Sequence, residues 1–186
     1  GVYIFNYKDL RKALIADHDD KTSEHDFGKN IIPNFLAQNK AIYAYRFHGY
    51  WRDVGTLESL HLANMELLPS KRNKETIDFD AYPTIFSEDT HSMPQFISSN
   101  GIVKDCLVNQ GAMIYGDVYQ CVISNEVIIN EGAVVKNSVL MPGVVVGKGA
   151  YINNAIISPG TEIKDKAVIN KDSDTIALID YERSLQ

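Results

Sequence analysis

A short aliphatic repeat in the C-terminal half of the chain constrains the fold more than any other feature. The last nine aliphatic positions of this repeat follow a cycle of 6, 6 and 5 residues, which gives a period of 17. Self-similarity at a fixed short period is typical of a solenoid, in which each repeat buries its apolar side chains against its neighbours. The recurring positions are Val103, Val108, Ile114, Ile123, Ile129, Val135, Leu140, Val146, Ile152, Ile157, Ile163 and Ile169.

The repeat predicts a triangular parallel β-helix, in which each face of a coil holds one short strand. Glycine, asparagine or aspartate recurs between the aliphatic positions, where the chain must turn a corner. The rival fold, an antiparallel β-sandwich, needs alternation with period two and turns about every 8–12 residues, whereas turn residues here come every five or six. The pattern is similar to that of the hexapeptide-repeat family. This resemblance implies coils that wind left-handed, an exception to the usual right-handed crossover.

Small residues occupy one corner of each coil, two places before an aliphatic position; they are Cys106, Cys121, Ser138 and Ala155. The two cysteines are the only ones in the chain, too few for a secreted disulfide scaffold or a cysteine zinc site. We expect them to stack about 5 Å apart in successive coils, as reduced thiols that pack the core.

Residues 1–68 show a mixed α/β pattern. We expect strands at residues 2–5 and 41–47, and helices near residues 8–16, 31–37 and 57–67, the last of them capped by Thr56. Three helices and two or three strands make only part of a layered α/β unit. We therefore expect the sheet to be completed by residues outside this sequence, and the chain to be a piece of a longer protein.

Composition changes after this segment. Residues 69–97 are rich in proline, serine, aspartate and histidine, which is typical of a linker, and several large apolar side chains within it favour an ordered one. The predicted organisation therefore has three zones: residues 1–68, the linker at residues 69–97, and a β-helix domain with a C-terminal tail at residues 98–186.

Charge and hydropathy exclude several classes of partner. Lysine and arginine total 18 against 24 aspartates and glutamates, a net charge of -6, with no basic run that could follow a phosphate backbone. We therefore expect neither nucleic acid nor membrane as a partner. No apolar run approaches the roughly 18 residues of a membrane-spanning helix, and the N-terminus lacks the order of a signal peptide. The predicted location is the cytosol.

Two clusters place a carboxylate beside an aromatic residue just ahead of a predicted helix, at residues 25–33 (HDFGKNIIP) and 50–56 (YWRDVGT). Such pairs suit a sugar, whose C–H faces pack on aromatic rings while its hydroxyl groups need acceptors. Ordinary structural roles are the alternative: Asp26 as a helix cap, Trp51 in a core, and Asp53 as the ion-pair partner of Arg52.

Four segments in this order resemble the C-terminal half of glucose-1-phosphate adenylyltransferase, the ADP-glucose pyrophosphorylase of bacterial glycogen synthesis. They are GVYIF, HDFGKNIIP, YWRDVGTLESLHLANMELL and the repeat itself. The WxDxGT part alone occurs across sugar nucleotidyltransferases. Asn30 departs from the pattern, because the family usually has aspartate there.

The resemblance implies both a fold and a site. The fold is the end of a Rossmann-like nucleotidyltransferase domain followed by a left-handed parallel β-helix. Carried over by position, Tyr3, Asp26, Phe27 and Trp51 form the glucose 1-phosphate pocket, and Asp53 is a catalytic Mg²⁺ ligand. The family's glycine-rich nucleotide loop, its arginine, a first metal-binding aspartate and the phosphate-binding lysine would all precede Gly1. We therefore expect the chain alone to be inactive.

The implied reaction joins ATP and glucose 1-phosphate into ADP-glucose and pyrophosphate, with sugar-phosphate effectors and a homo- or hetero-tetramer. Two other functions stay open: a nucleotidyltransferase for another sugar 1-phosphate, and a hexapeptide-repeat acyltransferase. The second needs a histidine between coils as its base, and all five histidines precede residue 98. The β-helix also suits an interaction and regulatory module, which is compatible with the adenylyltransferase.

Overall fold

The computed structural model describes residues 1–71 and 89–180. The chain divides into two compact units, and the boundary between them lies after His48. Most of the predicted linker, residues 72–88, and the end of the predicted tail, residues 181–186, lie outside the described residues. No helix within the described ranges has both the length and the apolar character needed to cross a membrane.

The first unit is helical. Its elements are α1 (Tyr7–Asp19), the π-helical turn η1 (Phe27–Ile31) and α2 (Ile32–Ala37). Asn6 caps α1 by accepting a 3.0 Å hydrogen bond from the main-chain N–H of Lys8. Ile31 and Phe35 are buried and pack the interior of this unit. The predicted helices are therefore confirmed, with α1 running three residues beyond the predicted end.

The two strands predicted for this unit are wrong. Residues 2–5 and 41–47 are not strands and have no ladder partner in the part of the chain that the structure describes. Their alternating apolar residues fit a strand. A strand forms, however, only where an adjacent strand pairs with its main-chain N–H and C=O groups. Several of these side chains, including Val2, Ile4, Tyr43 and Tyr45, are largely exposed.

The second unit begins with α3 (Leu57–Met65), which is capped as predicted. The Thr56 hydroxyl accepts from the Ser59 N–H at 3.2 Å, and the Ser59 hydroxyl accepts from the Thr56 N–H at 3.1 Å. This reciprocal capping box satisfies two main-chain donors at the start of the helix. A short 3₁₀ turn, η2 (Pro69–Lys71), follows.

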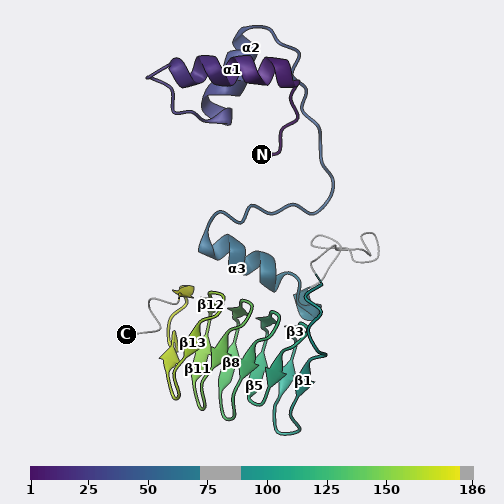
Figure 1. Ribbon diagram of the computed structural model, residues 1–186, viewed down its shortest axis with the longest axis vertical. Helices are drawn as coiled ribbons and strands as arrows, with labels where there is room; N and C mark the ends of the chain where they lie inside the picture. Colours follow the sequence, from purple (N-terminus) through teal and green to yellow (C-terminus); the bar gives the residue numbers. More distant parts are fainter. Residues whose placement is uncertain (72–88, 181–186) are drawn as a thin grey trace. The chain divides into compact units, whose positions relative to one another are not determined.

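A parallel β-helix makes up the rest of this unit and confirms the predicted solenoid (Figure 1). Its strands stack into three five-stranded parallel sheets in the orders β1-β4-β7-β10-β13, β14-β11-β8-β5-β2 and β15-β12-β9-β6-β3. The strands are β1 (Phe96–Ile97), β2 (Val103–Lys104), β3 (Leu107–Val108), β4 (Met113–Ile114), β5 (Asp117–Tyr119), β6 (Val122–Ile123), β7 (Ile128–Ile129), β8 (Val134–Lys136), β9 (Val139–Leu140), β10 (Val145–Val146), β11 (Tyr151–Asn153), β12 (Ala155–Ile157), β13 (Glu162–Ile163), β14 (Val168–Ile169) and β15 (Ala177–Ile179).

The predicted inward column is confirmed. Ile123 pairs with Leu140, and Leu140 pairs with Ile157, in neighbouring parallel strands. All three side chains are buried, and Val108 and Ile179 continue the column at its two ends. Because each coil repeats the same apolar position, the core is a stack of aliphatic side chains along the whole solenoid.

One early coil is two residues shorter than the 17-residue repeat. Val103 pairs with Val118, 15 residues later, whereas Val118 pairs with Val135, 17 residues later. The chain turns the corner between β4 and β5 with only two residues, one of which is Gly116. A Cβ at this position would lie 2.5 Å from the carbonyl oxygen of Ala133. Only glycine fits this corner without a shift of the next coil.

Helix α3 covers the outer face of the sheet that contains β9 and β12. Val139 and Ile156, which point out of the solenoid, are buried there, and so is Leu68 just after the helix. The His61 Nε2 lies 2.7 Å from the carbonyl oxygen of Asn137, at a solenoid corner. The helix and the solenoid are therefore one packed body.

Candidate functional site

Two aromatic rings pack against Phe27 of the first predicted cluster. The rings of Tyr3 and Phe27 are stacked, with centroids 5.6 Å apart and 20° between their planes. Phe5 contacts both of them and reaches Phe35 at 5.8 Å. Because Tyr3 is 45% exposed, part of this aromatic surface is open, and Asp26 directly precedes Phe27 in the chain.

Asp26 caps η1. Its Oδ1 accepts hydrogen bonds from the main-chain N–H groups of Gly28 and Lys29, both at 2.8 Å. The ordinary alternative, a helix cap, is therefore correct as far as Oδ1 is concerned. Oδ2 has no hydrogen-bond partner among the described residues, and Asp26 is exposed. One carboxylate oxygen holds the backbone while the other is open to a ligand.

Asn30, the departure from the family pattern, has a local role. Its Oδ1 accepts from the main-chain N–H of Asp26 at 3.2 Å, and its own N–H donates to the Asp26 carbonyl at 2.9 Å. An aspartate could accept the first hydrogen bond equally well. The substitution therefore leaves the position of Asp26 unchanged.

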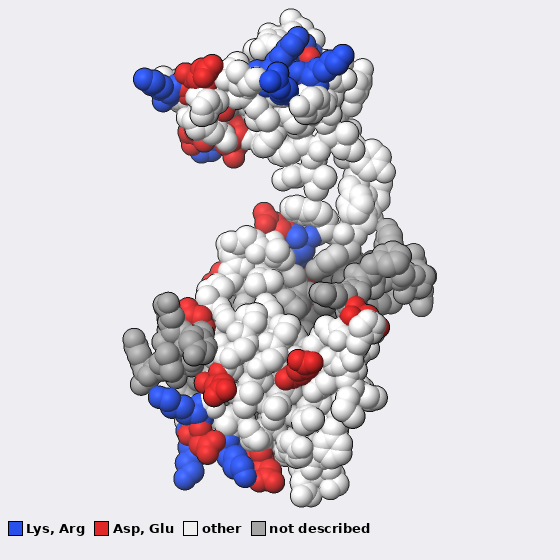
Figure 2. All heavy atoms as spheres, viewed as in Figure 1, with Lys and Arg blue, Asp and Glu red and all other residues white. Residues whose placement is uncertain are grey.

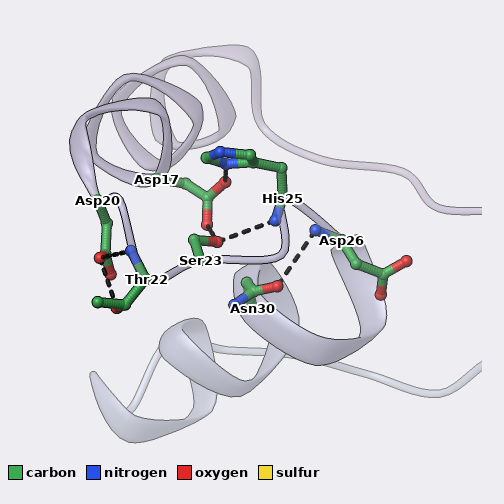
Figure 3. A network of polar contacts seen from close by, with 7 residues as sticks. All are labelled: Asp17, Asp20, Thr22, Ser23, His25, Asp26 and Asn30. Carbon is green, nitrogen blue, oxygen red and sulfur yellow. Dashed lines mark hydrogen bonds and ion pairs between the residues drawn. The ribbon is translucent and has the colours of Figure 1, made fainter.

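A polar network precedes Asp26 in the chain (Figure 3). The buried carboxylate of Asp17 accepts a 2.6 Å hydrogen bond from the Ser23 hydroxyl and lies 2.9 Å from the Nδ1 of His25. The hydrogen bond from Ser23, followed by that from His25, lowers the pKa of Asp17 below its usual value. Asp17 therefore remains a carboxylate across the neutral range.

Sequence reasoning missed this network. The quoted motif contained His25 without a role, and it contained neither Asp17 nor Ser23. One signal was available: Asp17 lies three and seven residues after Leu14 and Leu10, on the same face of α1. A carboxylate on the apolar face of a helix indicates a buried polar partner.

Trp51 and Asp53 belong to the second unit, whereas Tyr3, Asp26 and Phe27 belong to the first. Trp51 is 58% exposed, so the alternative that it is a core residue is wrong. Asp53 is exposed, and its Oδ1 accepts from the main-chain N–H of Gly55 at 3.0 Å.

Arg52 does not pair with Asp53, as the ordinary alternative proposed. Its guanidinium makes a two-point contact with the carboxylate of Glu66, through Nη2 to Oε1 and through Nε to Oε2 at 3.1 Å. The Tyr50 hydroxyl donates to the same Oε2 at 2.7 Å. Glu66 thus holds the segment on either side of Trp51 and leaves Asp53 available for another partner.

Asp53 fits one position in a magnesium site, because one of its oxygens is unpaired among the described residues. Those residues contain no group of three histidine, cysteine or acidic side chains that could hold a metal ion by themselves. Mg²⁺ in enzymes of phosphate chemistry is typically bound by one or two carboxylates together with substrate phosphates. The open carboxylate oxygen of Asp53 suits one ligand position of such an ion.

A separate hollow of about 410 Å³ lies along α1. It contains none of the five predicted site residues. Its lining is mostly apolar and consists of Tyr7, Leu10, Arg11, Leu14, Ile15 and His18. It lacks the carboxylate that a sugar site requires.

Two protein-family models match successive parts of the chain. Residues 1–70 match a model described as nucleotidyl transferase, and residues 91–181 match one described as GlmU-like, C-terminal hexapeptide. A glucose-1-phosphate adenylyltransferase of Desulfitobacterium hafniense (strain DSM 10664 / DCB-2) is 42% identical over 142 residues, which are 76% of this chain and 35% of that protein. The enzyme of the same name from Clostridium perfringens (strain 13 / Type A) is 44% identical over 76% of this chain and 36% of that protein.

The chain is related to the glucose-1-phosphate adenylyltransferases. A third relative of this name, from Bacillus thuringiensis (strain Al Hakam), is 41% identical over 77% of this chain and 38% of that protein. The resemblance predicted from the motifs is therefore confirmed, together with the nucleotidyltransferase and hexapeptide-repeat parts of the fold. The chain spans little more than a third of the length of the adenylyltransferases it matches.

Proposed function

We propose that this chain is the C-terminal part of a glucose-1-phosphate adenylyltransferase, which makes ADP-glucose and pyrophosphate from ATP and glucose 1-phosphate for glycogen synthesis. The observation that carries the proposal is the order of parts. A nucleotidyl transferase segment with the Asp26–Phe27 cluster leads into a hexapeptide β-helix, at above 40% identity to adenylyltransferases. The nucleotide-binding part would lie outside this sequence, so we expect the chain alone to be inactive.

In this proposal the aromatic cluster binds the sugar. The stacked Tyr3 and Phe27 offer an apolar surface for the C–H faces of glucose, and the open Oδ2 of Asp26 accepts a hydrogen bond from a sugar hydroxyl. Trp51, whose side chain is 58% exposed, keeps the sugar-binding role that the resemblance implies for it. The capped position of Asp26 supports the role, because a carboxylate already held by two main-chain donors binds without further ordering.

The chemistry needs no general base. A phosphate oxygen of glucose 1-phosphate is ionised at neutral pH and attacks the α-phosphorus of ATP; the new P–O bond forms as the bond to pyrophosphate breaks. Catalysis then depends on alignment of two anions and on compensation of the charge that develops between them. Asp53 would hold a Mg²⁺ ion, which supplies that positive charge when bound. Its unpaired oxygen and the separate partner of Arg52 support this role.

The β-helix would serve assembly and regulation, in a homo- or hetero-tetramer that binds sugar-phosphate effectors. Several apolar side chains on the solenoid are exposed, among them Phe96, Ile102, Met113 and Val168. The solenoid face visible in Figure 2 carries few charged side chains over its centre. Such a surface is better suited to a protein contact than to bulk water. A cytoplasmic location belongs to the same proposal.

Acyl transfer is not supported. The solenoid strands, from Phe96 to Ile179, contain no histidine. His61 does lie against the solenoid, but it is buried and its Nε2 is bonded to the Asn137 carbonyl. It cannot act as a base towards a thioester substrate in that position.

The experiment that tests the function is a substrate panel. The full-length protein that carries this chain is assayed for pyrophosphate release with each common nucleoside triphosphate and with glucose, galactose, mannose and N-acetylglucosamine 1-phosphates. We expect the highest kcat/KM for ATP with glucose 1-phosphate. A preference for another nucleotide or sugar would place the chain with another sugar nucleotidyltransferase, and acetyl-CoA-dependent acyl transfer without pyrophosphate release would refute the proposal.

A further inference from the structure

The Asp17–Ser23–His25 network connects α1 to the start of the candidate sugar site. Asp17 is 8% exposed, while the side chain of His25 is 56% exposed, so only one edge of the ring is packed. The ionised carboxylate of Asp17 can only accept hydrogen bonds. The contact of 2.9 Å therefore places a proton on Nδ1 of His25 and leaves Nε2 on the open side of the ring.

Ser23 joins the side chains of this network to the main chain. Its hydroxyl donates to Asp17 Oδ1 at 2.6 Å and accepts from the main-chain N–H of His25 at 3.0 Å. His25 is thus held twice, once through its ring and once through its backbone. Both contacts lead back to the same buried carboxylate.

The backbone at His25 needs this support. Its φ angle is 55°, in the left-handed region that non-glycine residues rarely adopt. This turn sends the chain directly into Asp26, whose Oδ1 caps η1 and whose N–H donates to Asn30. As Figure 3 shows, the Asp26 carboxylate points away from the His25 ring, so the two side chains face different surroundings.

Phe27 depends on the same turn. It follows Asp26 immediately, and its ring stacks on Tyr3 at 5.6 Å. A change of φ at residue 25 would rotate the chain that carries both Asp26 and Phe27. The contacts that stabilise φ at His25 therefore also determine where the carboxylate and the ring are presented.

We propose that Asp17 and His25 are positioning residues for the sugar site. The hydrogen bond from His25 Nδ1–H to Asp17 stabilises the left-handed turn, and the turn orients Asp26 and Phe27 toward the sugar. Neither positioning residue contacts the substrate. This inference rests on the proposed function, because it assumes that Asp26 and Phe27 bind glucose 1-phosphate.

A matched pair of substitutions separates positioning from direct contact. Asparagine at residue 25 places its amide nitrogen near the position of Nδ1 and tolerates a left-handed φ, whereas glutamine places its amide near the position of Nε2. In the full-length enzyme we expect His25→Asn to keep the KM for glucose 1-phosphate within about threefold of wild type. His25→Gln should raise this KM about tenfold with a smaller change in kcat. If His25→Gln kept the wild-type KM and His25→Asn raised it, Nε2 would bind the substrate directly, and the inference would be overturned.

Two further measurements make the inference independent of how well any single variant folds. The double variant Asp17→Ala/His25→Ala should raise the KM no more than the worse of the two single variants, because both substitutions remove the same His25–Asp17 hydrogen bond. Multiplicative effects on the KM would overturn the inference. In the ¹⁵N-histidine-labelled wild-type enzyme, NMR should show the proton of His25 on Nδ1. A neutral ring protonated only on Nε2 would contradict the network.

The failure of the inference can be told apart from the failure of the proposed function. Suppose that Asp26→Asn raises the KM for glucose 1-phosphate, but that His25→Gln does not raise this KM more than His25→Asn does. Only the positioning role is then wrong. If Asp26→Asn has no effect on this KM, the sugar-site assignment itself is wrong, and the positioning role falls with it.

Discussion

The main-chain N–H of Ala155 donates a 3.1 Å hydrogen bond to the side-chain hydroxyl of Ser138 in the preceding coil. The same hydroxyl lies 2.5 Å from the carbonyl oxygen of Lys136, to which it donates. Cys106 has the equivalent relationship to Cys121, whose N–H donates to the Cys106 sulfur at 3.4 Å. The small residues at this corner therefore do more than save space, because they satisfy main-chain groups between coils.

Substitution of Ser138 tests this role. Ser138→Ala leaves the Ala155 N–H unsatisfied at a fully buried position, which costs about 1–3 kcal/mol. We expect a lower free energy of unfolding by this amount in urea denaturation. Ser138→Cys, which restores the residue type of the two earlier coils, should lose less. Equal losses in the two variants would mean that the hydrogen bond from the Ala155 N–H does not contribute to stability.

Adjacent inward and outward positions on one strand test the inward-facing core of the solenoid. Val146 points inward and is fully buried, whereas the adjacent Val145 points outward and is partly exposed on the same strand. Val146→Asp puts an unpaired charge in a dry core at a cost of several kcal/mol, so the solenoid should lose cooperative thermal unfolding. Val145→Asp should unfold within a few degrees of wild type. A cooperative transition in Val146→Asp would contradict the inward column.

The two cysteines should differ in reactivity. A hydrogen bond from the Cys121 thiol stabilises the Cys106 thiolate and lowers the pKa of Cys106 to about 7, while burial raises the pKa of Cys121 well above its usual value. The thiolate fraction of Cys106 therefore rises as the pH increases through about 7. Alkylation by iodoacetamide, followed by mass spectrometry, should modify Cys106 with that midpoint and leave Cys121 protected in the folded protein. Faster modification of Cys121, or a midpoint near 9, would contradict this assignment.

Much of the solenoid could be predicted because its signal is local and repeated. The spacing of Ile123, Leu140 and Ile157 is enough to place them in one column, since each coil sees the same geometry. The shorter coil at Gly116 was visible only as a break in the cycle, and the need for glycine there comes from the approach of the Ala133 carbonyl in the next coil.

The rest depends on contacts that no short pattern encodes. Residues 2–5 have the apolar pattern of a strand. A strand also requires an adjacent strand to pair with, and the local sequence does not show whether such a strand is present. Arg52 adjoins Asp53 in the sequence, yet it pairs with Glu66 beyond α3, which only the fold can bring close. The contact between Asp17 and His25 likewise requires the turn at residues 20–25.

The sugar and metal roles lead to separable kinetic effects. Asp26→Asn removes a negative acceptor from the sugar and should raise the KM for glucose 1-phosphate by about tenfold, equivalent to ~1.4 kcal/mol of binding. Trp51→Ala should act in the same direction through lost packing. Lys21→Ala, at an exposed position in the loop after α1, is a surface control that should leave both constants unchanged.

Asp53→Asn is the measurement that tests the central claim most directly, that residues of this chain serve the sugar-phosphate side of an adenylyl transfer. Initial rates of pyrophosphate release by the full-length enzyme, at varied glucose 1-phosphate and magnesium, give kcat and KM for the variant. The substitution keeps the size of the side chain but removes the ligand charge, whose effect is greatest when charge builds on the transferring phosphoryl group. We predict a loss of kcat far larger than the change in KM. A kcat within about threefold of wild type, less than ~0.7 kcal/mol on the barrier, would contradict the account.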